Sequence, residues 1–226
     1  MPGTALLAAA LAGVLAVAGL FASLLAQANP QGQAQASASA QAAALPAHDS
    51  HQGLLIAADP YLTSERSEAR FGKKHPYHVG LLAIEVYLRN DTDGPMQIRL
   101  DTIELKISAP GQPRQRIAAL TALEAAFRIV LPNGPNPKKR RSPIPGVGAG
   151  GNKSKDVAKM EDALRPEMLP GDLIGPHNTV HGFVMFDIDD HFDWVGNATL
   201  YIPDVRRFGS GEKLLFFEID LGPATR

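Results

Sequence analysis

Alternation of apolar and polar side chains over residues 81–89 constrains the fold of this chain most strongly. In LLAIEVYLR one parity is wholly apolar, with Leu82, Ile84, Val86 and Leu88, and the other parity contains Ala83, Glu85, Tyr87 and Arg89. Successive side chains of a strand point to opposite faces, so this period of two predicts a β-strand with one buried face. The face that contains Glu85 is expected to meet solvent.

The next stretch predicts a turn and a second, bent strand. NDTDGP at residues 90–95 is a run of turn-forming residues. The apolar series that follows then changes parity, from Met96, Ile98 and Leu100 to Ile103, Leu105 and Ile107. Such a change would turn half of the strand over unless the chain absorbs a residue. We therefore expect a bulge or a bend near residues 101–102.

Two further segments have the apolar spacing of helices. One stripe predicts an amphipathic helix over residues 117–129, and its members are Leu120, Leu123, Phe127 and Val130. A shorter helix is expected in SKDVAKMEDALRPEML, with Ser154 as its N-cap and Pro166 near its end.

The remaining strands are expected near Leu54 and over residues 180–188, 198–203 and 213–221. Six or more short strands, most with one buried side, favour antiparallel sheets packed face to face. The expected fold is therefore mainly β, with the helical segments as an insert.

Four stretches together define an order of strands: GLLAIEVYLRNDTDGPMQIRLDTIELKI, HGFVMFDI, NATLYIPDV and EKLLFFEIDL. This order resembles bacterial exported immunoglobulin-like β-sandwich proteins of uncharacterised function. In these sandwich proteins a strand ends in an Asn-Asp/Asn-Thr/Ser turn. A late strand with the pattern Gly-x-x-x-Phe then precedes a final strand that is rich in aromatic residues. The resemblance covers residues 81–221 with gaps and implies an immunoglobulin-like antiparallel β-sandwich. It implies no activity, because it is a pattern of strands rather than of functional residues.

The N-terminus has an apolar run suited to export. Residues 5–26 are 22 residues without a charge, and a helix of that length spans about 33 Å, enough to cross a bilayer. Ala26-Gln27-Ala28 has the small-x-small pattern of a signal-peptidase site, which predicts cleavage before Asn29. Because MPGT contains no Lys or Arg, a retained membrane anchor is the alternative for residues 1–28. Both interpretations place the rest of the chain outside the cytoplasm, as a secreted, periplasmic or membrane-anchored protein.

Two segments are expected to be flexible. Residues 29–52 consist largely of Gln, Ala, Ser and Pro, and such a segment buries too little apolar surface to offset its ordering entropy. We expect a disordered linker there, before a β-sandwich domain at residues 53–226. Residues 132–154 are rich in Pro and Gly and contain four basic residues from Lys138 to Arg141, which predicts a flexible basic surface loop.

Composition excludes several chemistries. The chain has no cysteine, which excludes disulfides, thiolate catalysis, iron–sulfur clusters and cysteine zinc sites. With 22 basic and 23 acidic residues the net charge is −1, so nothing points to nucleic acid as a partner. We predict no cofactor.

The segment HNTVHGFVMFDIDDHFD offers candidate metal ligands, which are His177, His181, Asp187, Asp189 and Asp193. On a helix, histidines four apart share a face and can bind one ion. The flanking stretches GPHN and GFVMF instead favour a turn that leads into a strand. In a strand His177 and His181 are separated by about 13 Å, at ~3.3 Å per residue. The aspartates could bind calcium through oxygen ligands, but the calcium-loop spacing is absent. The favoured interpretation is a buried strand with polar ends.

The sequence therefore predicts an exported, non-enzymatic binding or structural module of the cell envelope, without catalytic residues. Its expected partner is an envelope protein or a polysaccharide. The alternative is an extracytoplasmic metal-dependent hydrolase or calcium-binding protein that uses residues 177–193. A cleft that held the histidines and aspartates of this segment within ligand distance would favour the alternative.

Overall fold

The computed structural model describes residues 30–132 and 155–225. By its internal contacts the chain divides into Met1–Ala34 and Gln35–Arg226, and every sheet belongs to the second unit. The fold is mainly β, with three antiparallel sheets and a few helices, as the alternating patterns predict.

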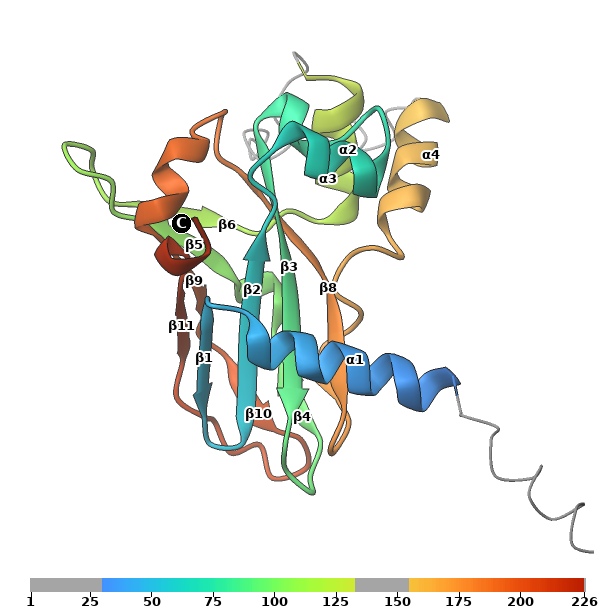
Figure 1. Ribbon diagram of the computed structural model, residues 1–226, viewed down its shortest axis with the longest axis vertical. Coiled ribbons are helices and arrows are strands. Elements are labelled where there is room, and N and C mark those ends of the chain that lie inside the picture. The colour runs from blue at the N-terminus through green and yellow to red at the C-terminus, as the bar shows by residue number, and fades with distance from the viewer. Residues whose placement is uncertain (1–29, 133–154, 226) are drawn as a thin grey trace, which may run out of the picture. The chain divides into compact units, whose positions relative to one another are not determined.

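Sheet A has the strand order β1-β2-β3-β8 and consists of His48–His51, Leu54–Pro60, Leu81–Asn90 and Thr179–Asp187 (Figure 1). Sheet B has the order β10-β4-β7, with Val205–Arg207, Met96–Ile98 and Leu173–Ile174. Sheet C has the order β11-β9-β5-β6, with Phe217–Asp220, Ala198–Ile202, Glu104–Ile107 and Gln115–Ala118.

The α-helices of the described residues are α1 Pro30–Ala44, α2 Ser64–Phe71, α3 Ala122–Val130 and α4 Lys155–Leu164. Short 3-10 helices are η1 Pro76–Val79, η2 Leu100–Thr102, η4 Phe192–Asn197 and η5 Gly222–Thr225.

One apolar core joins the three sheets. Ile84 and Val86 of β3 are fully buried in it, together with Ile98 of sheet B and with Leu105 and Leu200 of sheet C. The buried parity of β3 is the one that the alternation predicts. The inner face of sheet A therefore packs on side chains from both of the other sheets.

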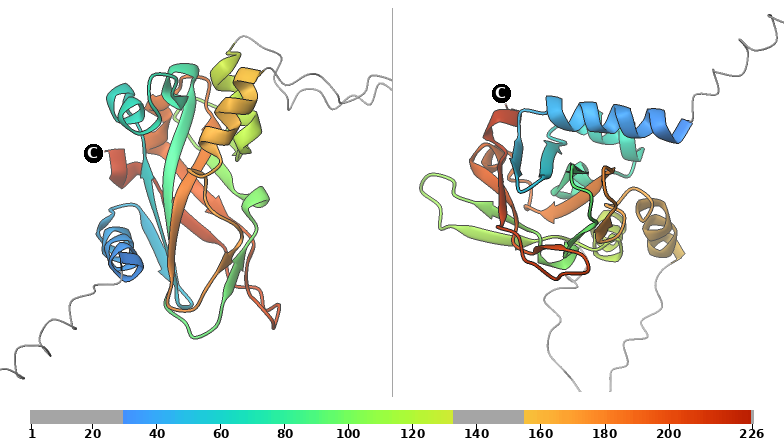
Figure 2. Two further views of the ribbon diagram at one scale, coloured as in Figure 1. Left: turned by 90° about the vertical axis from the view of Figure 1, so that its right-hand side faces the viewer. Right: turned by 90° about the horizontal axis from the view of Figure 1, so that it is seen from below.

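The opposite face of β3 is buried as well, which the alternation does not reveal. At one end of this outer face, α2, α3 and α4 cover residues such as Ala83 and Phe183, and α1 covers Ala57 and Tyr87 further along (Figure 2). Glu85 lies between these two zones and is only 8% exposed. The expectation that Glu85 faces solvent is wrong, because helices cover both of its neighbours along the strand.

Composition predicts a disordered linker over residues 29–52, but the described residues 30–52 form secondary structure instead. They contain α1 and β1, and Ala38 and Ala42, one helical turn apart, pack on Leu55 and Tyr87 of sheet A. Alanine has the highest helix propensity, and its short side chain lets a helix approach a sheet closely. The composition argument fails because the sheet, rather than the segment itself, supplies the large apolar side chains.

The predicted bend near residues 101–102 is confirmed. The 3-10 helix η2 lies there, between β4, which pairs with β10, and β5, which pairs with β9. The chain thus leaves sheet B and enters sheet C at the parity change. Ile98 before the bend and Leu105 after it are both fully buried.

Two predicted elements are shorter in the structure. The helix expected over residues 117–129 begins only at Ala122, because Thr121 is its N-cap and forms a capping box with Glu124. The strand expected over residues 213–221 is reduced to β11, and Leu215, which should share its buried face, is 65% exposed.

Side chains of β1 and of Gln52, which follows it, contact the last strand and the residues just before that strand. The backbone N–H of Glu218 donates to Asp49 Oδ2 at 3.1 Å, and that of Leu215 donates to Gln52 Oε1 at 2.8 Å. The ring of His51 stacks on Phe217 with 3.8 Å between centroids. Sheets A and C are therefore joined along one side as well as through the core.

Several predictions fall on other parts of the chain. The signal peptide or anchor at residues 1–28, the basic run within residues 132–154 and the N-cap Ser154 lie outside the described residues. Within residues 30–132 and 155–225, no helix is both long enough and apolar enough to cross a membrane.

His75, just before η1, is a buried titratable group. It is 1% exposed, its ring lies 4.0 Å from that of His78, and neither ring nitrogen has a hydrogen-bond partner among the described residues. Burial, and next the neighbouring His78, lowers the pKa of His75 below its usual 6.5. The folded chain therefore resists protonation at this position.

This lowered pKa makes stability depend on pH. Below about pH 6.5 the unfolded chain binds a proton at His75 that the folded chain does not bind, so the free energy of unfolding should fall as the pH drops. We expect His75→Phe to reduce the dependence of the free energy of unfolding on pH below about pH 6.5. Urea unfolding at several pH values measures this dependence. His177→Gln, at an exposed histidine, is the control, and an equal flattening in that variant would contradict the assignment.

Candidate functional site

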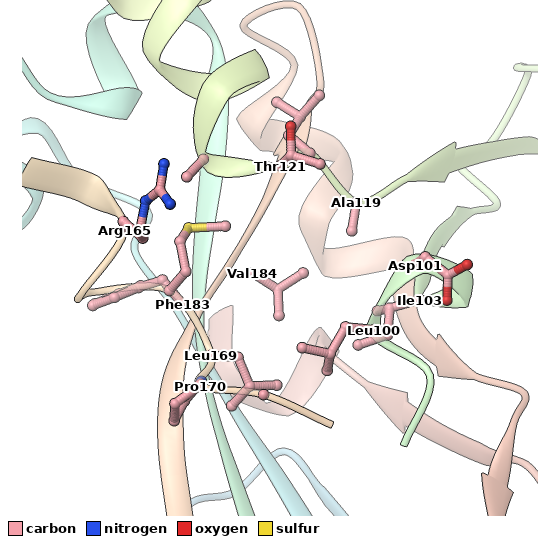
Figure 3. A pocket seen from close by; sticks show the side chains of 14 residues that line it. Leu100, Asp101, Ile103, Ala119, Thr121, Arg165, Leu169, Pro170, Phe183 and Val184 are labelled. Carbon is pink, nitrogen blue, oxygen red and sulfur yellow. The ribbon is translucent and has the colours of Figure 1, made fainter. Parts of the chain in front are cut away.

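An apolar pocket of about 460 Å³ lies beside the edge of β8 (Figure 3). Phe183 and Val184 of β8 line it from one side. Its other walls are η2 with Ile103, the 119–122 stretch that leads into α3, and the 168–171 segment after α4.

The pocket exists because two separate segments pair with one strand edge. The N–H of Leu120 donates to the carbonyl of Met185 at 2.8 Å, and the N–H of Leu169 donates to the carbonyl of Phe183 at 3.0 Å. These segments come from different parts of the sequence and reach β8 at neighbouring positions. The cavity lies between them.

Side chains from two apolar clusters meet in this pocket. Ile103 and Leu169 belong to the core between the sheets, whereas Leu120 and Phe183 belong to the cluster under α2, α3 and α4. The pocket therefore lies where the two clusters adjoin at the margin of sheet A. Its interior is apolar, as is typical of sites that bind small molecules.

Gly182 sets the distance of one pocket wall. A Cβ atom at Gly182 would lie 2.6 Å from Leu169 Cα and 2.7 Å from the Leu169 nitrogen, well inside the ~3.5–4.0 Å of ordinary carbon contacts. Only glycine lets the 168–169 backbone approach β8 this closely. A glycine within a strand is a recognised sign of such an approach.

The polar side chains of the lining are Asp101, Thr121 and Arg165, and the described residues pair each of them. Asp101 accepts hydrogen bonds from Arg99 at 3.2 and 2.6 Å, which hold the pKa of its carboxyl below the usual range. Thr121 is part of the capping box of α3. Arg165 donates to Glu161 at 2.7 Å.

This lining suits binding better than acid–base chemistry. Among the described residues, no histidine and no other carboxylate lines the pocket, and the one hydroxyl is already engaged. General acid–base catalysis requires a titratable group within hydrogen-bond reach of the reacting atom. The arrangement offers an apolar surface that excludes water instead.

The candidate metal ligands of residues 177–193 are held apart by different partners. His177 Nε2 lies 2.8 Å from Asp93 Oδ1, and His181 Nδ1 lies 3.1 Å from Glu85 Oε1. Asp187, at the end of β8, pairs with Arg128 at 3.2 Å.

Asp189 lies in the exposed turn after β8 and Asp193 is exposed in η4. Across the part of the chain that the structure describes, no group of three or more His, Asp or Glu side chains is placed to hold a metal ion. The favoured interpretation of this segment agrees with β8, whose residues 182–186 are buried and whose ends are polar.

Glu85 is the centre of a buried polar cluster that the sequence does not predict. Tyr61 donates to Glu85 Oε2 at 3.3 Å, and the ring of His181 stacks on that of Tyr87 with 5.1 Å between centroids. Burial, followed by the charge of Glu85 and a hydrogen bond to it, raises the pKa of Tyr87. The Tyr87 phenol therefore stays protonated beside the Glu85 carboxylate.

Asp59 lies directly opposite Glu85 in the β2–β3 register, and its charge is compensated locally. Arg66 of α2 donates to Asp59 Oδ1 at 2.9 Å and lies over the ring of Tyr61, 4.0 Å from its centroid. Like charges opposite one another on a sheet are destabilising. This cation from α2 offsets the repulsion and fixes the helix to sheet A.

Sequence comparison assigns no family to the chain. No protein-family model matches it, and no curated protein is similar to it in sequence. Among solved structures, it is similar to a functionally unknown protein from Listeria monocytogenes EGD-e, with a TM-score of 0.33 and 9% identity over 69% of this chain and 70% of that chain. A likeness at this level assigns neither a fold family nor a function.

We expect Gly182→Ala to lower the free energy of unfolding by about 1–3 kcal/mol, because the added methyl group forces the 168–169 backbone away from β8. Urea unfolding measures this loss. Gly175→Ala is the matched control, since a Cβ there would meet Asn178 Nδ2 at 3.7 Å, an ordinary contact. Equal stability of the two variants would show that the close approach does not constrain the wall.

We expect Glu85→Ala to lower the free energy of unfolding by about 1–3 kcal/mol, because the buried Tyr61 phenol loses its acceptor. Glu104→Ala, at a surface glutamate whose partner Arg116 is 3.5 Å away, should stay within about 0.5 kcal/mol of the unmodified protein. Thermal and urea melts compare the two. If Glu85→Ala left the free energy of unfolding unchanged, Glu85 would behave as the solvent-facing residue that the alternation predicts.

Proposed function

We propose that this protein is an exported, non-enzymatic binding module of the cell envelope, and that the pocket beside β8 takes an apolar ligand. The observation that supports this best is the pocket itself. Its volume of about 460 Å³ lies in the range of roughly 300–1,000 Å³ found for ligand sites. Its lining is apolar except for Asp101, Thr121 and Arg165.

The pairing of those polar groups favours binding over catalysis, because none is left as an acid, base or nucleophile facing the interior. The alternative of a metal-dependent hydrolase or a calcium-binding protein gains no support from residues 177–193. Its two candidate ligand histidines, His177 and His181, bind different carboxylates, Asp93 and Glu85.

Export and the place in the envelope rest on the sequence. The uncharged apolar run at residues 5–26 and the Ala26-Gln27-Ala28 pattern support a cleaved signal, or alternatively an anchor. An envelope protein or polysaccharide stays the predicted partner. The apolar lining favours an apolar group of that partner as the part that enters the pocket.

We also propose that the sheets form an immunoglobulin-like sandwich related to bacterial exported proteins. The shared core between sheet A and sheets B and C supports this arrangement. The helical cover on the outer face of sheet A is the feature in which the chain departs from a plain two-sheet sandwich.

The proposal is tested by filling the pocket. Ala119 points into the cavity (Figure 3), so Ala119→Phe should weaken the binding of decan-1-ol at least tenfold in isothermal titration calorimetry. Ala118→Phe is the matched control, because Ala118 is the exposed neighbour outside the lining. Circular dichroism checks the fold of both variants. Absence of decanol binding to the unmodified protein, or equal binding by both variants, would contradict the proposal.

A further inference from the structure

The pocket has a cation at its mouth whose donors are only partly used. Arg165 follows α4, and its guanidinium lies at the pocket edge (Figure 3). The side chain is 67% exposed, and Nη2 donates to Glu161 Oε1. A guanidinium has five N–H donors, and this is the one side-chain hydrogen bond of Arg165 within the described residues. Further donors of Arg165 therefore remain for a ligand.

The acidic group of the lining does not compete for that role. Asp101 lies across the cavity from Arg165, and its carboxylate points away from the interior (Figure 3). Arg99 pairs with it through two hydrogen bonds, so its charge is compensated outside the pocket. A ligand in the pocket thus meets apolar side chains along its length and a cation at one end.

We propose that the ligand is a free fatty acid, bound with its chain among Phe183, Val184 and Leu169 and its carboxylate on Arg165. This inference rests on the proposed function of the pocket and adds the class of ligand. Arginine is well suited to the head group, because its planar fork can donate two parallel hydrogen bonds to a carboxylate. The exposed position of Arg165 lets the head group stay partly hydrated while the chain leaves water.

The size of the cavity favours one chain of medium length. At ~30 Å³ for each water-sized group, 460 Å³ accommodates roughly fifteen such groups. A single chain of about ten carbons and its carboxylate fit this space, whereas the two chains of a membrane phospholipid do not. Affinity should therefore rise from hexanoate to decanoate and then level off.

The test compares three ten-carbon probes by isothermal titration calorimetry at pH 8. Decanoate should bind about tenfold more tightly than decan-1-ol, which corresponds to one charge-assisted interaction at ~1.4 kcal/mol per factor of ten. Decylammonium should bind more weakly than the alcohol. Arg165→Gln should bring the ratio of the decanoate affinity to the decan-1-ol affinity from about ten to about one, and Arg165→Lys should retain part of this preference.

Arg116→Gln is the matched control, because Arg116 is 64% exposed, belongs to β6 of sheet C and is outside the pocket lining. It should leave all three affinities unchanged. This inference fails, while the proposed function stands, if decanol binds and decanoate binds no more tightly than decanol. It fails in the same way if Arg165→Gln still binds decanoate more tightly than decanol. If neither probe binds, the proposed function fails with it. If decylammonium bound more tightly than decan-1-ol, the pocket mouth would not have the positive charge that we assign to it.

Discussion

Burial of β3 on both faces is the constraint on which the rest of the structure depends. One face packs into the core shared with sheets B and C, and the other lies under helices. A strand with apolar contacts on both sides fixes the register of its neighbours, since a slip of one residue would exchange the two faces. The pairing of β2 and β8 on either side of β3 follows from this, and with it the position of every residue on the outer face of sheet A.

The pocket is a consequence of how β8 ends the sheet. An unpaired strand edge exposes backbone donors and acceptors that need partners. Leu120 and the segment around Leu169 supply them, but they arrive from different parts of the chain and leave a gap between them. Gly182 permits one of these approaches, because any side chain there would meet the 168–169 backbone. The same residues that protect the edge of the sheet therefore shape the cavity.

The polar cluster around Glu85 shows how the helical cover changes the chemistry of a strand. A carboxylate in the middle of a sheet face is well hydrated if the face is open, but here α1 and α2 lie on either side of it. The cluster is tolerated because Tyr61, Tyr87 and His181 surround the carboxylate, and Arg66 compensates its neighbour Asp59. Buried polar groups with complete partners of this kind rigidify a structure, whereas incomplete ones destabilise it.

By itself the sequence determined the strand periodicity, the inner face of β3, the bend between β4 and β5 and the buried strand within residues 177–193. These are local properties, because period and parity are read along the chain. Only the tertiary structure decided that α1 docks where a linker is expected, that Glu85 is buried, and that Leu120, Arg165 and Phe183 line one pocket. Each depends on which segment covers a given face or edge, and that is set by contacts between residues far apart in the sequence. Gly182 in the middle of a strand was the one local sign of the pocket wall.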